Sequence, residues 1–469
     1  MRVLTPASRI SVNVYWLITG LFGLAYGIYG YYAFVYLQRL NPTAASLLDP
    51  LLPVLAATMV FELIAEPVTG RFADVFGRRI SVVIAFLLIA TSFLIYASAS
   101  FSSAEQEAGL VQAIAIGAEL VLAIGLAFHS GSLDAWVVER VYEGEGSRDV
   151  CMEPVFARAG QFFTAGLTIG GVIGSFAVAQ TPESMSASQR IVWIWPWLIS
   201  AAIMLLTMLI SAAVMYVRPN LRAPDWSTPT SPIAFATDAF DRVLKLARAP
   251  TRLQQAIVVM SSMYAIGIMF IYFSTLLAEQ ILKQSGHPGW LYALPGLLLA
   301  PRLAGPQAAI LLTRGTDPGD QAAHARMLRN VGVLASVSAV ALGYFASRLL
   351  SVASSPLEEP WTLGMGCLAF VSTSFFHHMS KPITSAYLNY NIEDDADRAF
   401  VNSMGTPAGG LLVAVIAVGL MVANRAVNNP QAQDLYLVFA VPGLAAFVAT
   451  LLVTRPRPAR PVAAPQRPL

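Results

Sequence analysis

Charged side chains are scarce in this chain. Only 12% of its 469 residues are Asp, Glu, Lys or Arg, and 56% are hydrophobic, whereas soluble domains carry about 25% charged residues. The mean hydropathy is +0.62. This composition excludes an ordinary water-soluble domain, because most side chains must face lipid or other apolar helices.

Cysteine and net charge are also low. The chain has 2 cysteines and a formal net charge of +2. Cys151 falls in a predicted loop and Cys367 inside a predicted helix, so we expect no disulfide, and no zinc-type spacing is present. The small net charge gives no basic field for nucleic acid. No Walker sequence and no nucleophile-and-base set is present, so we expect no cofactor, no metal site and no enzyme activity.

Long hydrophobic runs are what the chain has in abundance. A helix that crosses a bilayer needs roughly 20 mostly apolar residues. The first run lacks a cleavage pattern, so we expect it to be retained. Twelve spans are predicted, at residues 12–37, 49–72, 79–99, 108–139, 153–179, 191–217, 253–280, 288–312, 327–350, 360–390, 398–424 and 434–454.

One longer separation divides the spans into six and six. Residues 218–252 begin with several prolines, which break helices, and continue as an amphipathic pattern over residues 233–249. This segment is predicted to lie on the membrane surface or to pack on the bundles as a soluble linker helix. The expected units are a bundle at 1–217, a cytoplasmic linker at 218–252, a bundle at 253–454 and a disordered tail at 455–469.

The basic residues set the expected orientation. Most of the 29 lysines and arginines fall on the side of the predicted spans that also holds both ends of the chain. Cytoplasmic segments carry such an excess. We therefore expect a monomeric multi-pass protein of the plasma membrane (the inner membrane, in a bacterium) with both termini in the cytoplasm.

A short charged turn separates the second and third predicted spans. Residues 70–79 match the pattern G-x-x-x-D-x-x-G-R-[RK] at Gly70, Asp74, Gly77, Arg78 and Arg79. This turn resembles the signature loop of the major facilitator superfamily. The resemblance implies an all-α membrane protein of twelve helices in two pseudo-symmetric six-helix bundles, which rock to expose a central cavity alternately.

The resemblance also implies roles for the loop. Asp74 would face the N-terminal end of span eleven, where the helix dipole favours a carboxylate, and Arg78 would pair with Glu139 at the end of span four. The alternative is that the loop only carries topology charges. The implied conformational switch comprises Gly70, Asp74, Gly77, Arg78, Arg79 and Glu139.

Two weaker signals fit the same family. Residues 130–136, at the end of span four, and residues 381–387, at the end of span ten, have a similar pattern, as expected for duplicated halves. Span five carries four glycines in an imperfect version of the motif of the superfamily's antiporters, and ordinary small-residue packing is the alternative. These glycines are Gly166, Gly170, Gly171 and Gly174.

Ionisable side chains inside a span cost roughly 2.5–3.5 kcal/mol each on insertion scales, so each indicates a function or a partner. Glu66, Glu119 and Asp134 are the candidates for proton coupling. Alternatively, Glu62 and Glu66 only pair with Arg158 or with nearby hydroxyls. Span eight adds Arg302, and the candidates for a substrate or proton pathway are Glu62, Glu66, Glu119, Asp134, Arg158, His377 and Lys381.

Spans one and ten provide further candidates. Lys381 lies in a polar stripe with Ser374, His377 and Thr384, and the internal repeat places it at a depth similar to that of Asp134. We predict that Asp134 and Lys381 close an inner gate or bind a charged group, the alternative being two snorkelling charges.

Aromatic residues of span one are the remaining candidates. Tyr26 and Tyr29 share one face of the span and would stack on an organic substrate. The alternative is an aromatic belt at the membrane interface.

These observations predict a secondary active transporter for a small organic molecule. We expect proton coupling, and the glycines of span five favour export. The alternatives are a uniporter or importer of a nutrient or ion, including a metal ion held by Met and His side chains of spans seven and ten, or a receptor or assembly factor on the same fold.

Overall fold

The computed structural model describes residues 4–40, 51–101, 108–146, 152–180, 191–215, 237, 241, 251–284, 293–314, 316, 320–351, 360–390, 405–426 and 431–451. Most of the predicted surface helix at 233–249 lies outside these residues. So do the predicted tail at 455–469, Cys151 and the first residues of span eleven.

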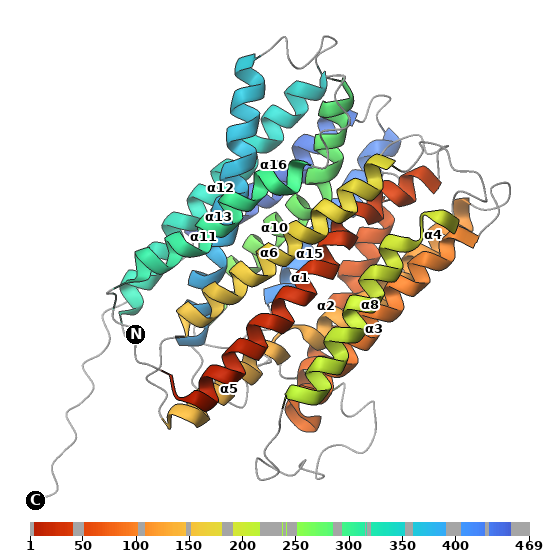
Figure 1. Cartoon of the computed structure of the whole chain (residues 1–469). Helices are drawn as coiled ribbons and strands as arrows, with labels where there is room; N and C mark the ends of the chain where they lie inside the picture. Colours follow the sequence, from red (N-terminus) through yellow and green to blue (C-terminus); the bar gives the residue numbers. More distant parts are fainter. Residues whose placement is uncertain are drawn as a thin grey trace, which may run out of the picture.

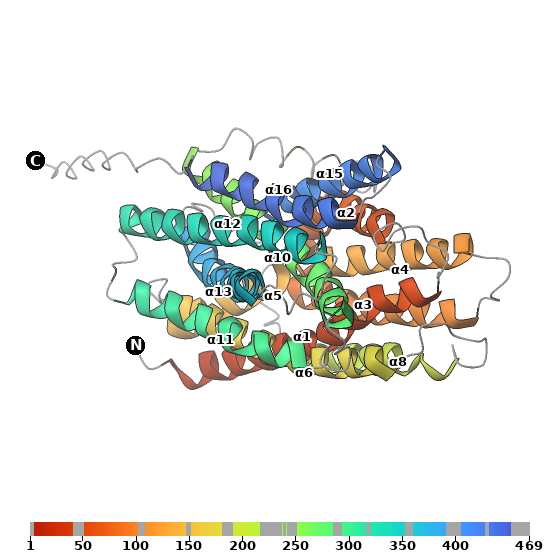
Figure 2. The same ribbon diagram turned by 90° about the horizontal axis from the view of Figure 1, so that it is seen from above.

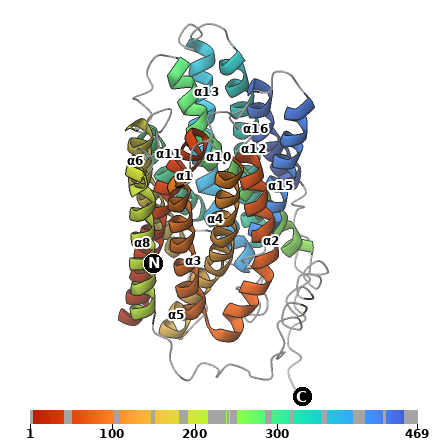
Figure 3. The same ribbon diagram turned by 90° about the vertical axis from the view of Figure 1, so that its right-hand side faces the viewer.

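Every regular element in this part of the chain is a helix, and the long helices run side by side (Figure 1 and, from the side, Figure 3). They are α1 (Pro6–Leu40), α2 (Leu51–Phe76), α3 (Arg78–Ser98), the 3-10 turn η1 (Ala99–Phe101), α4 (Ala108–His129), α5 (Ser132–Glu145), α6 (Glu153–Gln180), α8 (Trp195–Val214), α10 (Thr251–Gln284), α11 (Leu294–Thr313), α12 (Gln321–Ser351), α13 (Pro360–Tyr390), α15 (Gly405–Ala426) and α16 (Gln431–Leu451).

Each predicted span overlaps a helix, and only span four consists of two, α4 and α5. Within the described residues, 9 segments are long and apolar enough to cross a membrane, and residues 408–419 and 437–451 form shorter apolar helices. Together with the apolar surface described below, they identify a multi-pass membrane protein.

The break in span four is a feature that hydrophobicity alone did not reveal. The sequence predicts one continuous helix over residues 108–139, but α4 ends at His129 and α5 starts at Ser132. Gly131 between them has φ 69°, a left-handed conformation that glycine adopts readily and other residues avoid. The short α5 then packs against α1 and α3, as the lower end of Figure 1 shows for α1 and α5.

The two halves of the chain pack by the same scheme. In the first half α1 contacts α6 and α8, α3 contacts α4 and α8, and α2 contacts α4. In the second half α10 contacts α15 and α16, α12 contacts α13 and α16, and α11 contacts α13. Each pair has its counterpart six spans later, so the halves are related by a pseudo-two-fold axis, as expected from the sequence.

The halves meet along two seams, α2 with α15 and α6 with α11, which lie on opposite sides of the molecule viewed from above (Figure 2). The axis exchanges these two seams, because α11 is the counterpart of α2 and α15 the counterpart of α6. Small residues bring the helices close: a Cβ at Gly171 of α6 would lie 3.1 Å from Pro295 of α11. Small residues are typical of close helix contacts in membranes.

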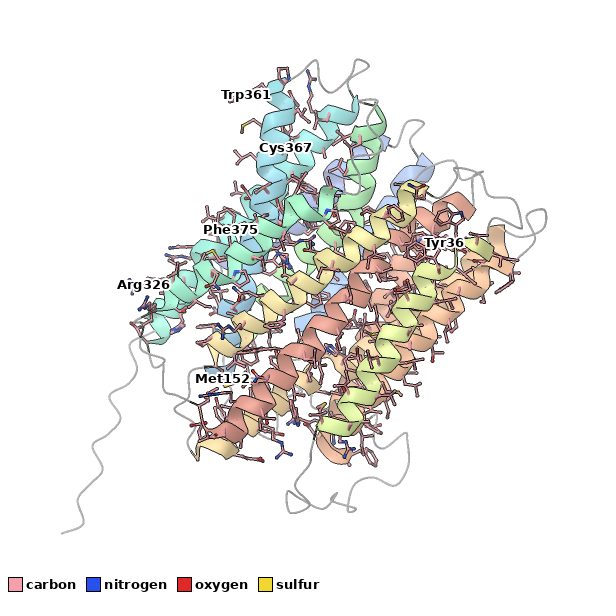
Figure 4. All side chains as sticks on the ribbon, in the orientation of Figure 1. Tyr36, Met152, Arg326, Trp361, Cys367 and Phe375 are labelled. Carbon is pink, nitrogen blue, oxygen red and sulfur yellow. The ribbon has the colours of Figure 1, made fainter. Side chains whose placement is uncertain are left out.

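The outer surface is apolar. Large hydrophobic side chains are exposed on several helices, including Leu297 at 68% and Trp361 at 77%, and Figure 4 labels Trp361 on α13 with the exposed Cys367 further along the helix. Apolar surface of this extent would be unfavourable in water but is suited to lipid.

The interior of the first half is aromatic. Trp197 of α8 is 1% exposed, and its ring stacks on Tyr96 at 4.6 Å between centroids with an interplanar angle of 5°. Tyr29, Tyr32 and Tyr36 of α1 surround the same indole. This cluster holds α1, α3 and α8 together.

Candidate functional site

The signature segment, residues 70–79, comprises the last turns of α2, Gly77 and the start of α3, and it connects several helices at one end of the first half. Arg78 forms an ion pair with Glu139 of α5 at 2.8 Å and a longer one with Asp74 at 3.6 Å. The Arg79 guanidinium donates a hydrogen bond to the backbone oxygen of Ala212 in α8. Gly77 has φ 98°, so a side chain there would be strained.

The ion pair that the family resemblance implied, Arg78 with Glu139, is therefore present. Gly70 lies in the last turns of α2. The expected partner of Asp74, the start of span eleven, falls in residues outside the described part of the chain. The role of the loop as a conformational switch stays a prediction.

Glu119 is a buried acid held by hydroxyl groups of three other helices. It is 1% exposed and accepts hydrogen bonds from Tyr29 at 2.5 Å, from Thr58 at 2.7 Å and from Tyr96. The donors come from α1, α2 and α3, so this carboxylate joins four helices of the first half. Tyr29 is 0% exposed and Tyr26 is 7% exposed; their stacking on a substrate stays a prediction.

Glu62 lies at the boundary between the halves. It is 2% exposed, and the Tyr264 hydroxyl of α10 donates to its two oxygens at 3.3 and 3.4 Å. This contact connects α2 of the first half with α10 of the second. Glu66 follows one turn later and is 0% exposed.

Arg158 is not brought to these acids. It is exposed and stands over the ring of Trp16, 5.2 Å from the ring centroid. The sequence suggested Arg158 or a nearby hydroxyl as the partner of Glu62, and the structure shows a hydroxyl, that of Tyr264.

Asp134 and Lys381 do not form an ion pair in the described part of the chain. Asp134 accepts a hydrogen bond from Tyr15 at 2.7 Å. Lys381 is exposed, and its Nζ lies 5.7 Å from the ring centroid of Phe163 in α6. A pairing of the two in another conformation stays a prediction.

The second half carries a basic cluster. Arg302 of α11 is 1% exposed, and its Nη2 donates to the Tyr31 hydroxyl of α1 at 3.4 Å. His377 of α13 lies against Gly267 of α10, where a Cβ would be 2.1 Å from the ring. Arg302 and Lys381 are close enough to interact electrostatically with His377 and with its neighbour His378.

Sequence reasoning noted Arg302 as an intramembrane charge but did not place it in the site, and it missed the two tyrosines that cover buried charges, Tyr31 and Tyr264. A signal was available for Arg302. Its span also carries Ala304 and Gly305, and small residues are typical of helix faces that pack closely on other helices.

Comparisons with known proteins were informative only at the level of structure. No protein-family profile matches the chain, and no curated protein matches it. The E. coli fucose:proton symporter FucP aligns with a TM-score of 0.60 at 14% identity, over 96% of this chain and 100% of that one. The chain has the fold of the major facilitator superfamily.

Two further transporters of this fold are similar to a comparable degree. The xylose transporter XylE from E. coli, in a partially occluded inward-open conformation, aligns with a TM-score of 0.63 at 14% identity, over 95% of this chain and 98% of that one. The human organic anion transporter MFSD10 aligns with a TM-score of 0.59 at 16% identity, over 95% and 100% of the two chains. Such low identities establish the fold, and function must be argued from the site.

Proposed function

We propose that the protein is a secondary active transporter that moves a small organic molecule across the plasma membrane by alternating access, driven by protons. The observation that carries this proposal is the contact between Glu62 and Tyr264. It places a buried acid of one half against a hydroxyl of the other, so that the contact must change when the halves rock.

Glu62 is better placed for coupling than Glu119. All hydrogen-bond donors to Glu119 belong to its own half, and a rigid-body movement leaves them in place. A buried carboxyl group is less costly when neutral than when charged. Proton binding at Glu62 would therefore favour conformations that enclose it, which is the property that coupling requires.

The glycines of α6 support close packing more than they support export. A Cβ at Gly166 or Gly170 would lie 2.1 or 2.0 Å from a backbone oxygen of α1, inside the same half. Only Gly171 reaches both Tyr31 and α11. Whether the protein exports or imports its substrate is therefore a matter for measurement. Uniport is the alternative if transport does not depend on protons.

The test is transport by the purified chain in sealed proteoliposomes with an imposed pH gradient, against a panel of anionic, cationic and neutral compounds. We expect uptake or efflux of at least one compound to depend on the gradient. Glu62→Gln should abolish that dependence, whereas the matched control Glu143→Gln, which alters an exposed pair with Arg140, should not.

Two results would count against the proposal. If transport by Glu62→Gln responds to the pH gradient as strongly as transport by the wild type, another acid must couple transport to protons. No transport of any compound would leave the receptor or assembly factor as the better interpretation.

Two further features are part of the proposal. The bias of Lys and Arg toward one side of the spans supports cytoplasmic termini, which reporter fusions at each end would test. We also propose a monomer, for which the mass of the protein–detergent complex is the measurement.

A further inference from the structure

The most unusual group in the described structure is the guanidinium of Arg302. It is 1% exposed, yet its Nε and Nη1 have no hydrogen-bond partner among the described residues. Its one hydrogen bond within the described residues is donated by Nη2 to the neutral Tyr31 hydroxyl at 3.4 Å. An unpaired buried charge costs several kcal/mol, so this group calls for a counter-ion.

The charged side chains that act on the two histidines of this cluster are positive within the described residues. The charged and titratable groups that act on His377 and His378 are Arg302, Lys381 and the histidines themselves, and no carboxylate is among them. The intramembrane acids Glu62, Glu66, Glu119 and Asp134 all belong to the first half, on α2, α4 and α5. Arg302 forms no ion pair with a carboxylate among the described residues.

Other polar atoms without a partner lie on the facing helix. Ser374 is 0% exposed and its Oγ has no partner, and the Nδ1 of His377 has none either, within the described residues. The two side chains are one turn apart on α13. The helices α11 and α13 are in close contact here, because a Cβ at Gly305 would lie 2.6 Å from the backbone oxygen of Phe375.

We infer that Arg302, with Ser374, binds the oxyanion group of a small organic anion, such as a carboxylate or a phosphate ester. A guanidinium presents two parallel N–H groups that match such an oxyanion, and the Ser374 hydroxyl can donate a further hydrogen bond. Tyr31 covers the site from the opposite half, so rocking of the halves opens it. That this anion is the transported substrate rests on the proposed function.

The test is thermal unfolding of the full-length protein in detergent, at constant ionic strength with chloride as the reference. The probes are the sodium salts of acetate, benzoate, succinate, glycerol phosphate and inorganic phosphate, with glucose and tetramethylammonium as neutral and cationic comparators. At least one oxyanion should raise the melting temperature saturably, and Arg302→Gln should weaken its half-saturation by at least about tenfold.

A matched control and a conservative variant keep the test sharp. Arg326→Gln removes an exposed arginine of α12 and should leave the stabilisation unchanged. If Arg302→Gln does not fold, Arg302→Lys decides: it keeps the charge but loses the guanidinium fork, and we expect weaker binding. Stabilisation by none of the oxyanions, or equal affinity in wild type and the Arg302 variants, overturns the inference.

Proteoliposome transport separates this inference from the proposed function. Gradient-driven transport of only neutral or cationic compounds would retain the transporter and overturn the anion site. Arg302-dependent binding of an anion that is never transported would retain the site and overturn the transporter.

Discussion

The closest helix contact in the first half offers the sharpest prediction. Glycines of α1 and α6 face each other's backbones: a Cβ at Gly170 would lie 2.0 Å from the backbone oxygen of Leu24, and one at Gly23 would lie 2.3 Å from that of Phe163. In a membrane, van der Waals packing rather than the hydrophobic effect holds helices together, so this contact matters more than it would in water.

Gly170→Ala should therefore destabilise the protein. Real Cβ contacts stay above 3.0 Å, so α1 and α6 would have to separate by about 1 Å at this level. Overpacking of this kind costs about 1–3 kcal/mol. The helix itself gains up to about 1 kcal/mol from replacing glycine by alanine, so we expect a net loss of about 0–2 kcal/mol with a lowered melting temperature.

Gly117→Ala is the matched control. Gly117 also lies inside a helix, α4, but a Cβ there would meet nothing within 4 Å. Only the helix-propensity gain remains, so this variant should melt at or above the wild-type temperature. Both are measured by thermal unfolding in the same detergent. If Gly170→Ala melts as high as Gly117→Ala, the described approach of α1 to α6 is wrong.

Three further predictions concern single contacts, all measured as melting temperature or free energy of unfolding. Gly77→Ala should lose about 1–3 kcal/mol although it creates no contact, because φ 98° with ψ 144° is a conformation that residues other than glycine rarely adopt; an unchanged value would contradict this backbone conformation. Glu119→Leu should lose about 2–5 kcal/mol, because buried hydroxyls of Tyr29 and Tyr96 lose their acceptor; wild-type stability would mean that the cluster does not form. Glu139→Gln should lose at most about 1 kcal/mol, since the Glu139 side chain is 50% exposed. A larger loss would mean that the ion pair contributes more to stability than an exposed pair does.

The sequence was sufficient for the helices and for one contact. The spans could be located from the length of the apolar runs, because a helix needs roughly 20 apolar residues to cross a bilayer. Arg78 and Glu139 could be identified as partners because the family that the signature loop resembles has this ion pair. The break at Gly131 was missed because a glycine within an apolar run looks the same whether its φ is helical or positive.

The partners of the buried charges could not be predicted for a different reason. Tyr31 and Arg302 are separated by 271 positions and Glu62 and Tyr264 by 202. Sequence periodicity gives the face of a helix on which a residue lies, but not which of the other helices covers that face. The surroundings of Glu119 show the same limit, since its three hydroxyl donors come from three other helices.

The two cross-half contacts are related to each other. Glu62 of α2 is covered by Tyr264 of α10, and Arg302 of α11 is covered by Tyr31 of α1. The pseudo-two-fold axis exchanges α2 with α11 and α10 with α1, so the same helix pairing places an acid under a tyrosine in one case and a base under a tyrosine in the other. Neither tyrosine neutralises the charge beneath it, and a buried charge without a counter-charge is costly. A proton at Glu62 would remove one cost and an anion at Arg302 the other. The two ligands would be coupled if each of them favours the same arrangement of the halves, because both contacts change when the halves rock.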